Sequence, residues 1–84
     1  MKHIGQTALD SIEPLLADLR KIEGLTERKR GLFYRKSAAF LHFHEDPAGI
    51  FADIRSGGEW LRMAVNTPVE RGKLLRAARA AFSL

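Results

Sequence analysis

AAFLHFHEDPAGIFADIRSGGEWLRMAV, residues 38–65, is the stretch of the chain that decides the fold. Apolar and polar side chains alternate along three segments of it, at about residues 38–44, 49–55 and 60–65, and this pattern is typical of strands with one buried face. The two intervening breaks, EDPA and SGGE, contain the Pro and Gly residues that tight turns require. Connections this short join antiparallel neighbours, so we predict a β-meander.

The flanking segments add one strand and two helices to this prediction. A further strand fits about residues 32–35, and apolar residues at helical spacing predict a helix over about residues 12–23, with Ser11 as its N-cap. TPVE, residues 67–70, has the form of a capping box and begins a helix over about residues 68–82. We therefore expect a single α+β domain over residues 1–84, with two layers and the order α-β-β-β-β-α. Both helices would cover one face of the four-stranded antiparallel meander.

The alternation assigns the strand residues to two faces of the sheet. The almost wholly apolar face, which the helices should cover, contains Leu32, Tyr34, Ala39, Leu41, Phe43, Ile50, Ala52, Ile54, Leu61, Met63 and Val65. The other face mixes aromatic, basic, acidic and imidazole side chains, and its candidate binding residues are Phe33, Arg35, Phe40, His42, His44, Phe51, Asp53, Arg55, Trp60 and Arg62. A slip of one residue would exchange the faces, so the pattern fixes the parity of pairing.

Cross-strand partners on this mixed face follow from the same alternation. In one register His42 lies opposite Asp53. Asp53 is in turn a candidate partner of Arg62, and Arg55 of Trp60. The pattern leaves other registers open, because a shift of two residues keeps every side chain on its face.

The composition of the mixed face favours binding over catalysis. Aromatic and arginine side chains without lysine are typical of the centre of a protein interface. We therefore predict a small non-catalytic interaction module that binds a protein partner or forms a homodimer, with Trp60 and Phe40 near the centre of contact. The alternative is that cross-strand aromatic and ion pairs simply cover an exposed sheet.

An enzyme is the second hypothesis, because His42 and His44 project from the same face near Asp53. Two imidazoles and a carboxylate, from Asp53 or from Glu45 or Asp46 in the turn, can bind zinc and leave a position open for water. Without a metal, Asp53 could orient an imidazole as a His–Asp pair. Ser37 and Ser56 are predicted at turns, so no acyl-transfer triad can be assembled. Paired histidines on a strand are common, and we expect no bound metal and no other cofactor.

Binding of single-stranded nucleic acid is the third hypothesis. The net charge of +4 is concentrated in residues 27–36 and 68–84, and the aromatic side chains of the mixed face could stack on bases. Residues 37–67 are net negative, however, and the chain lacks the RNA-binding consensus. The sequence also has no cysteine, no apolar run long enough to span a membrane and no secretory signal, so we expect a cytoplasmic protein.

Three motifs carry a resemblance to a known group of proteins. They are FYR at residues 33–35, AFLHFHEDP at residues 39–47 and GIFAD at residues 49–53. With the C-terminal helix that follows, this pattern resembles a family of short bacterial proteins over about residues 31–82. The family has no assigned activity, so the resemblance implies a small free-standing bacterial domain and assigns no functional residue.

Overall fold

The computed structural model of the protein describes residues 2–81, and it has the predicted α+β class. Helices α1 (Gln6–Ser11) and α2 (Glu13–Arg20) precede the sheet, and α3 (Pro68–Ala80) follows it. The antiparallel meander has five strands in sequential order: β2 (Leu25–Lys29), β3 (Leu32–Arg35), β4 (Ala38–Asp46), β5 (Gly49–Ser56) and β6 (Glu59–Ala64). A short β1 (Lys2–His3) pairs with the far end of β4.

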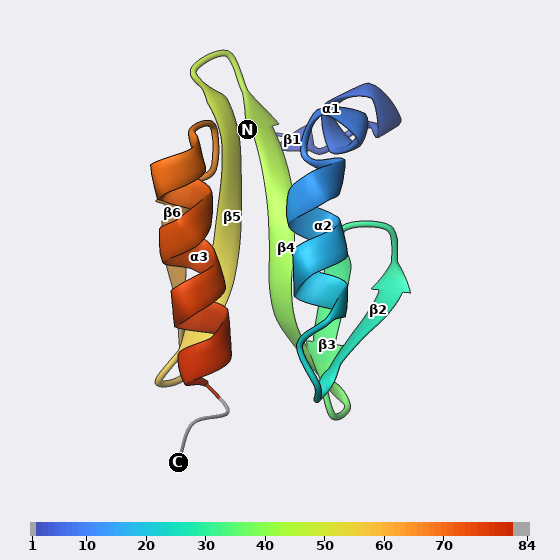
Figure 1. Ribbon diagram of the computed structural model, residues 1–84, viewed down its shortest axis with the longest axis vertical. Helices are drawn as coiled ribbons and strands as arrows, with labels where there is room; N and C mark the ends of the chain where they lie inside the picture. Colours follow the sequence, from blue (N-terminus) through green and yellow to red (C-terminus); the bar gives the residue numbers. More distant parts are fainter. Residues whose placement is uncertain (1, 82–84) are drawn as a thin grey trace.

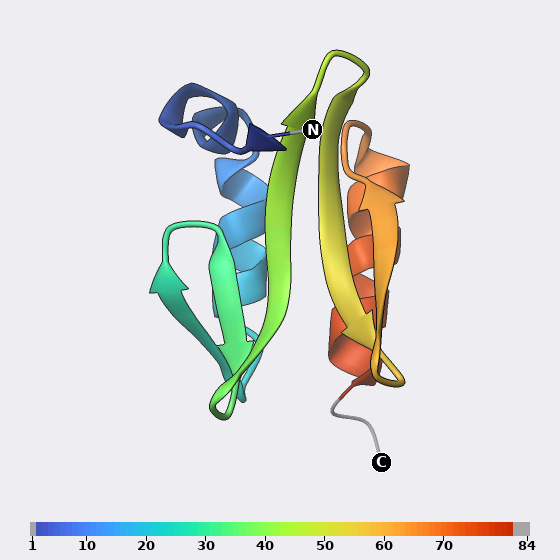
Figure 2. The same ribbon diagram turned by 180° about the vertical axis from the view of Figure 1, so that it is seen from behind.

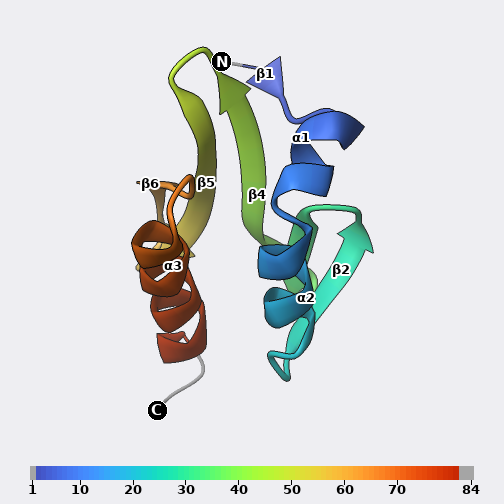
Figure 3. The same ribbon diagram turned by 45° about the horizontal axis from the view of Figure 1, so that its top comes forward.

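Helices α2 and α3 lie on the same face of the sheet. Figure 1 shows α2 in front of the half that contains β3 and β4, and α3 in front of the half that contains β5 and β6. The tilted view in Figure 3 shows the same arrangement. Seen from behind, the sheet turns its other face to the viewer, and none of the described helices covers it (Figure 2). None of these helices is long and apolar enough to cross a membrane.

The core lies between the helices and the covered face of the sheet. The central strands β4 and β5 contribute Leu41, Phe43, Ala52 and Ile54, all of them buried as the alternation predicts. The helices supply the opposing apolar side chains, among them Leu9, Ile12, Leu15, Leu16, Leu19, Leu74 and Ala78. Burying a side chain of the size of Leu or Phe contributes roughly 1.5–3 kcal/mol, so this layer holds the two halves of the molecule together.

The N-terminal helix differs from the prediction, which was wrong in its bounds and in its cap. Residues 12–23 do not form one helix: α1 ends at Ser11, Ile12 leaves helical geometry with φ −113° and ψ 17°, and α2 ends at Arg20. The break follows from Pro14, whose ring would clash with the carbonyl of Asp10 if α1 continued unbroken. Within α2, Pro14 stands in the first turn, where no intrahelical N–H is lost. Ser11 therefore ends a helix and is not an N-cap.

The predicted meander of four strands was one strand short. Strand β2 lies in a segment that the charge pattern identified only as basic, and it pairs with β3 at the edge of the sheet. Leu25 is the only apolar residue in its sequence LTERK, so alternation could not reveal it. Its Glu27 carboxylate accepts hydrogen bonds from the Arg20 guanidinium and the Gly31 amide, and these contacts tie the edge strand to α2.

A β-bulge reverses the predicted faces at the start of β4. The register changes from Phe33 opposite Leu41 to Tyr34 opposite Ala39, which leaves Phe40 as the extra residue. Phe33 and Phe40 are consequently buried in the core, although the alternation placed both on the mixed face. Arg35 was also misplaced, since it shares the face of the buried Phe33 two residues earlier in β3. Conversely, six residues predicted for the covered face are not fully buried: Leu32, Tyr34, Ala39, Ile50, Leu61 and Met63. Of these, Ile50 and Met63 still pack against the core.

The start of α3 confirms the predicted capping box. The hydroxyl of Thr67 accepts a hydrogen bond from the Glu70 amide at 3.2 Å, and the Glu70 carboxylate accepts one from the Thr67 amide at 3.1 Å. The helix ends at Ala80, and Phe82, which the sequence placed on its apolar side, lies outside the described residues.

Removal of this cap gives a first testable prediction. We expect Thr67→Ala to lower the free energy of unfolding by about 1 kcal/mol, because the Glu70 amide loses its acceptor. Urea denaturation measures the difference, and Thr67→Ser, which keeps the hydroxyl, is the control. Equal stabilities for the Ala and Ser variants would show that the cap contributes nothing.

Candidate functional site

The uncovered face of the sheet brings seven side chains of the predicted mixed face together. We call this surface the open face, and its residues are His42, His44, Phe51, Asp53, Arg55, Trp60 and Arg62. All three predicted cross-strand pairs are confirmed: His42 lies opposite Asp53, Asp53 opposite Arg62, and Arg55 opposite Trp60. The antiparallel register of β4, β5 and β6 thus aligns an imidazole, a carboxylate and a guanidinium across the face.

Asp53 is the buried charged group at the centre of this face, with 6% of its surface exposed. Arg62 donates to both carboxylate oxygens, from Nε to Oδ1 at 2.8 Å and from an Nη to Oδ2 at 2.9 Å. Nε2 of His44 lies 3.0 Å from Oδ2. The hydrogen bonds from Arg62 lower the pKa of Asp53 and outweigh the opposing effect of burial, so the carboxylate stays ionised.

A row of stacked side chains runs across the open face from β4 to β6. The His42 ring packs edge-on against His44 and against Trp60, with 4.7 Å between ring centroids in each case. The Arg55 guanidinium carbon lies 4.8 Å from the centroid of the Trp60 indole ring. These contacts are of the aromatic and cation–π kinds. Trp60 nevertheless keeps 43% of its surface exposed, so a partner can still reach the indole.

Sequence reasoning missed one further aromatic contact. The Arg28 guanidinium carbon lies 4.5 Å from the centroid of the Tyr34 ring. Tyr34 alternates with the buried Phe33, so its ring lies on the uncovered side of the sheet. The pairing of Thr26 with Tyr34 in β2 and β3 was the missing information, because β2 could not be recognised from its sequence.

The candidate metal ligands do converge, but one of them is already engaged. Ligand atoms of His42, His44 and Asp53 lie within 4.8 Å of one another, and two imidazoles with a carboxylate suit zinc. A cation there would compete with Arg62, whose guanidinium holds both oxygens of Asp53. The arrangement therefore favours a structural carboxylate over a metal ligand, and an enzymatic role for this set stays a prediction.

The Asp53–Arg62 pair makes stability depend on pH in a definite direction. The pKa of Asp53 is lower in the folded chain than its ordinary value. The pair thus stabilises the fold above the unfolded pKa of about 3.9, and this contribution is lost as the pH falls through the lower folded pKa. We expect Arg62→Ala to raise the Asp53 pKa and to move the loss of stability to higher pH. Carboxyl NMR titration and urea denaturation from neutral to acidic pH measure both effects.

The control for this experiment is Arg76→Ala, which removes an exposed arginine from α3. It should leave the pKa of Asp53 unchanged. An unchanged Asp53 pKa in Arg62→Ala as well would contradict the account of this pair.

The comparisons with known proteins return nothing: no protein-family model, curated protein or solved structure matches the chain.

Proposed function

We propose that the protein is a non-catalytic interaction module that binds an acidic segment of a partner protein on its open face. The observation that carries the proposal is the row formed by His42, Trp60 and Arg55 on a sheet face without a helical cover. An exposed indole that packs against a guanidinium group is the kind of group that anchors protein interfaces. The row is fixed by ring contacts before a partner arrives, which lowers the entropy lost on binding.

The charge that the open face presents supports an acidic partner. Its central acid, Asp53, is buried, and both its oxygens bind Arg62. The Arg62 side chain itself is 51% exposed, and Arg55 is exposed above the indole ring. The outward-facing charge of the row is therefore positive, and carboxylates of a partner would be attracted to it.

The same charge argues against a second copy of the chain as the occupant. A two-fold interface places the same patch on both subunits, so it would gather the exposed guanidinium groups of Arg55 and Arg62 from both chains. Like charges brought together in this way weaken association. The burial of Phe33 and Phe40 also removes two aromatic rings that the sequence assigned to every binding hypothesis, so the present proposal relies on Trp60 and not on Phe40.

Isothermal titration calorimetry with a synthetic peptide of Glu and Phe residues tests the proposal. The matched control is a peptide in which every Glu is replaced by Lys. We expect saturable binding of the acidic peptide, no binding of the basic one, and weaker binding as salt is added. A dimer in light scattering that Trp60→Asp dissociates, or binding of a single-stranded oligonucleotide without binding of the acidic peptide, would overturn it.

A further inference from the structure

Strands β4 and β5 stop pairing with each other and diverge at one end of the sheet. Their pairing runs from Asp46 opposite Gly49 to Leu41 opposite Ile54. Beyond that point residues 38–39 of β4 pair with β3, and residues 55–56 of β5 pair with β6. Figure 2 shows the two strands diverging toward their separate turns. The two backbones thus form a fork, and each has one edge that faces the gap.

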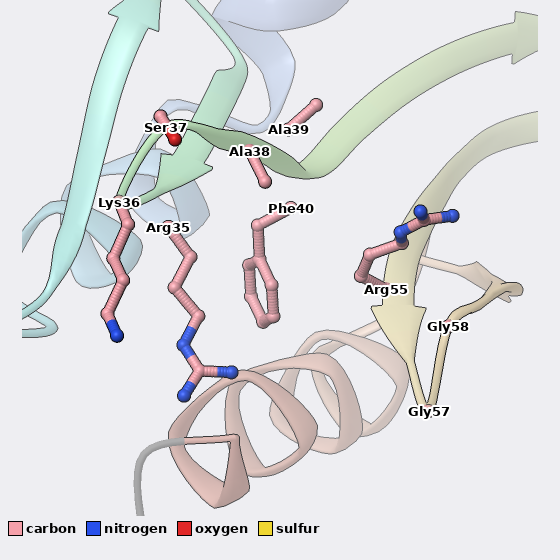
Figure 4. A pocket seen from close by; sticks show the side chains of 9 residues that line it. All are labelled: Arg35, Lys36, Ser37, Ala38, Ala39, Phe40, Arg55, Gly57 and Gly58. Carbon is pink, nitrogen blue, oxygen red and sulfur yellow. The ribbon is translucent and has the colours of Figure 1, made fainter.

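A cleft of about 580 Å³ occupies this fork, and we call it the fork cleft. Arg35 and Lys36 line one wall, Arg55 lines the other, and the ring of Phe40 lies between them (Figure 4). None of the described residues that line it is acidic. Its volume falls within the range of roughly 300–1,000 Å³ that is typical of small-molecule sites.

The two glycines at the mouth of the cleft have a structural explanation. Gly57 and Gly58 have φ values of 58° and 87°, which a two-residue turn between β5 and β6 requires. A Cβ atom at either position would meet nothing within 4 Å, so the mouth is open on this side. A ligand can therefore enter the fork cleft without moving a side chain of this turn.

Lys36 in the opposite turn has a conformation that its residue type does not favour. Its φ is 59°, and within the described part of the chain it is the one non-glycine residue with positive φ. Glycine or asparagine adopts this conformation at lower cost. The two-residue turn between β3 and β4, in which Arg35 pairs with Ala38, requires this positive φ. Figure 4 shows the Lys36 side chain extended beside that of Arg35, which places both basic groups along one wall.

We propose that the fork cleft binds the phosphate or diphosphate group of a small organic ligand. The guanidinium groups of Arg35 and Arg55 offer paired donors that match phosphate oxygens, and the ammonium group of Lys36 adds a mobile positive charge. Ala38 and Ala39 provide the accessible apolar surface for the organic part of the ligand, above the buried ring of Phe40. This site lies at the end of the sheet and shares Arg55 with the open face, whereas Arg35 and Lys36 belong to the fork cleft alone.

NMR titration with sodium pyrophosphate at low ionic strength tests this proposal. We expect saturable shifts of the amides of residues 35–40 and 55–58. Lys36→Asn should weaken binding at least about fivefold and keep the melting temperature at or above that of the wild type, because asparagine tolerates positive φ. Lys73→Gln removes one positive charge from an exposed position of α3, and it should leave the affinity for pyrophosphate within about twofold of the wild type.

Three results would overturn the fork-cleft proposal. They are the absence of saturable shifts, an equal loss of affinity in Lys36→Asn and Lys73→Gln, and an oligonucleotide that binds more tightly than pyrophosphate with shifts along the whole open face. Lys36→Asn should also leave binding of the acidic peptide unchanged, so the two proposals can fail separately.

Discussion

Phe43→Ala is expected to remove about 3–5 kcal/mol from the free energy of unfolding, the usual cost of deleting a core aromatic ring. Phe43 is buried at the centre of β4, opposite Ala52, and it lies in the core that α2 and α3 cover. Truncation would leave a cavity that neighbouring side chains fill only in part. Because small domains have a total stability of roughly 5–15 kcal/mol, a large fraction of the variant would unfold at moderate temperature.

The matched control for this variant is Phe51→Ala, which deletes the same ring from the open face. Phe51 is half-buried and lies opposite His44, on the side without helices. We expect a clearly smaller loss of stability, and thermal and urea denaturation of both variants provide the comparison. A Phe43→Ala protein as stable as the wild type would show that the faces of β4 are reversed.

Trp60→Asp is expected to abolish binding of the acidic peptide while the chain remains folded. The substitution removes the exposed indole ring and adds a negative charge beside Arg55 and Arg62. Loss of a tryptophan anchor typically costs about 2 kcal/mol or more in binding, which weakens affinity at least about 30-fold. Circular dichroism should show the wild-type spectrum, because α2 and α3 pack on the opposite face.

Leu61→Asp is the matched control, since it places the same charge on the next residue of β6. Leu61 is 51% exposed and points toward the other side of the sheet. Calorimetry should find its affinity for the acidic peptide close to that of the wild type. Equal losses in the two variants would mean that the position of Trp60 on the open face is irrelevant to binding.

The central part of the fold was predictable because two independent patterns agree there. The covered-face positions are all apolar in residues 41–44 of β4 and residues 50–54 of β5. The short turn that contains Pro47 restricts how the two strands pair. The capping box at Thr67 was equally predictable, because it depends only on local residue types. These features required no knowledge of distant contacts.

The errors arose where a distant contact overrides the local pattern. Residues 38–41 read AAFL, and all are apolar, so alternation could not locate the bulge at Phe40 that buries two rings. Strand β2 forms because Glu27 binds Arg20 and Gly31, and neither contact leaves a periodic signal. Its side chains bury little apolar surface, so β2 is stabilised by its pairing with β3 and by the contact of Glu27 with α2.

The candidate site was also predictable only in part. The antiparallel pairing of β5 with β6 allowed two cross-strand pairs to be predicted from the sequence: Asp53 with Arg62, and Arg55 with Trp60. The contact of His42 with Trp60 spans two strands, so it depends on the twist of the sheet and was not predictable from pairing alone. The fork cleft depends on the divergence of β4 and β5, which follows from the bulge that alternation missed.

Fluorescence of Trp60 is the most direct measurement of whether the open face binds an acidic partner. Trp60 is the single tryptophan of the chain, so its emission reports this face alone. A peptide of Glu and Phe adds no tryptophan signal. We predict that saturating acidic peptide shifts the emission to shorter wavelength and protects it from acrylamide, while the Lys peptide does neither. Unchanged emission and quenching at saturating acidic peptide would contradict the proposed function.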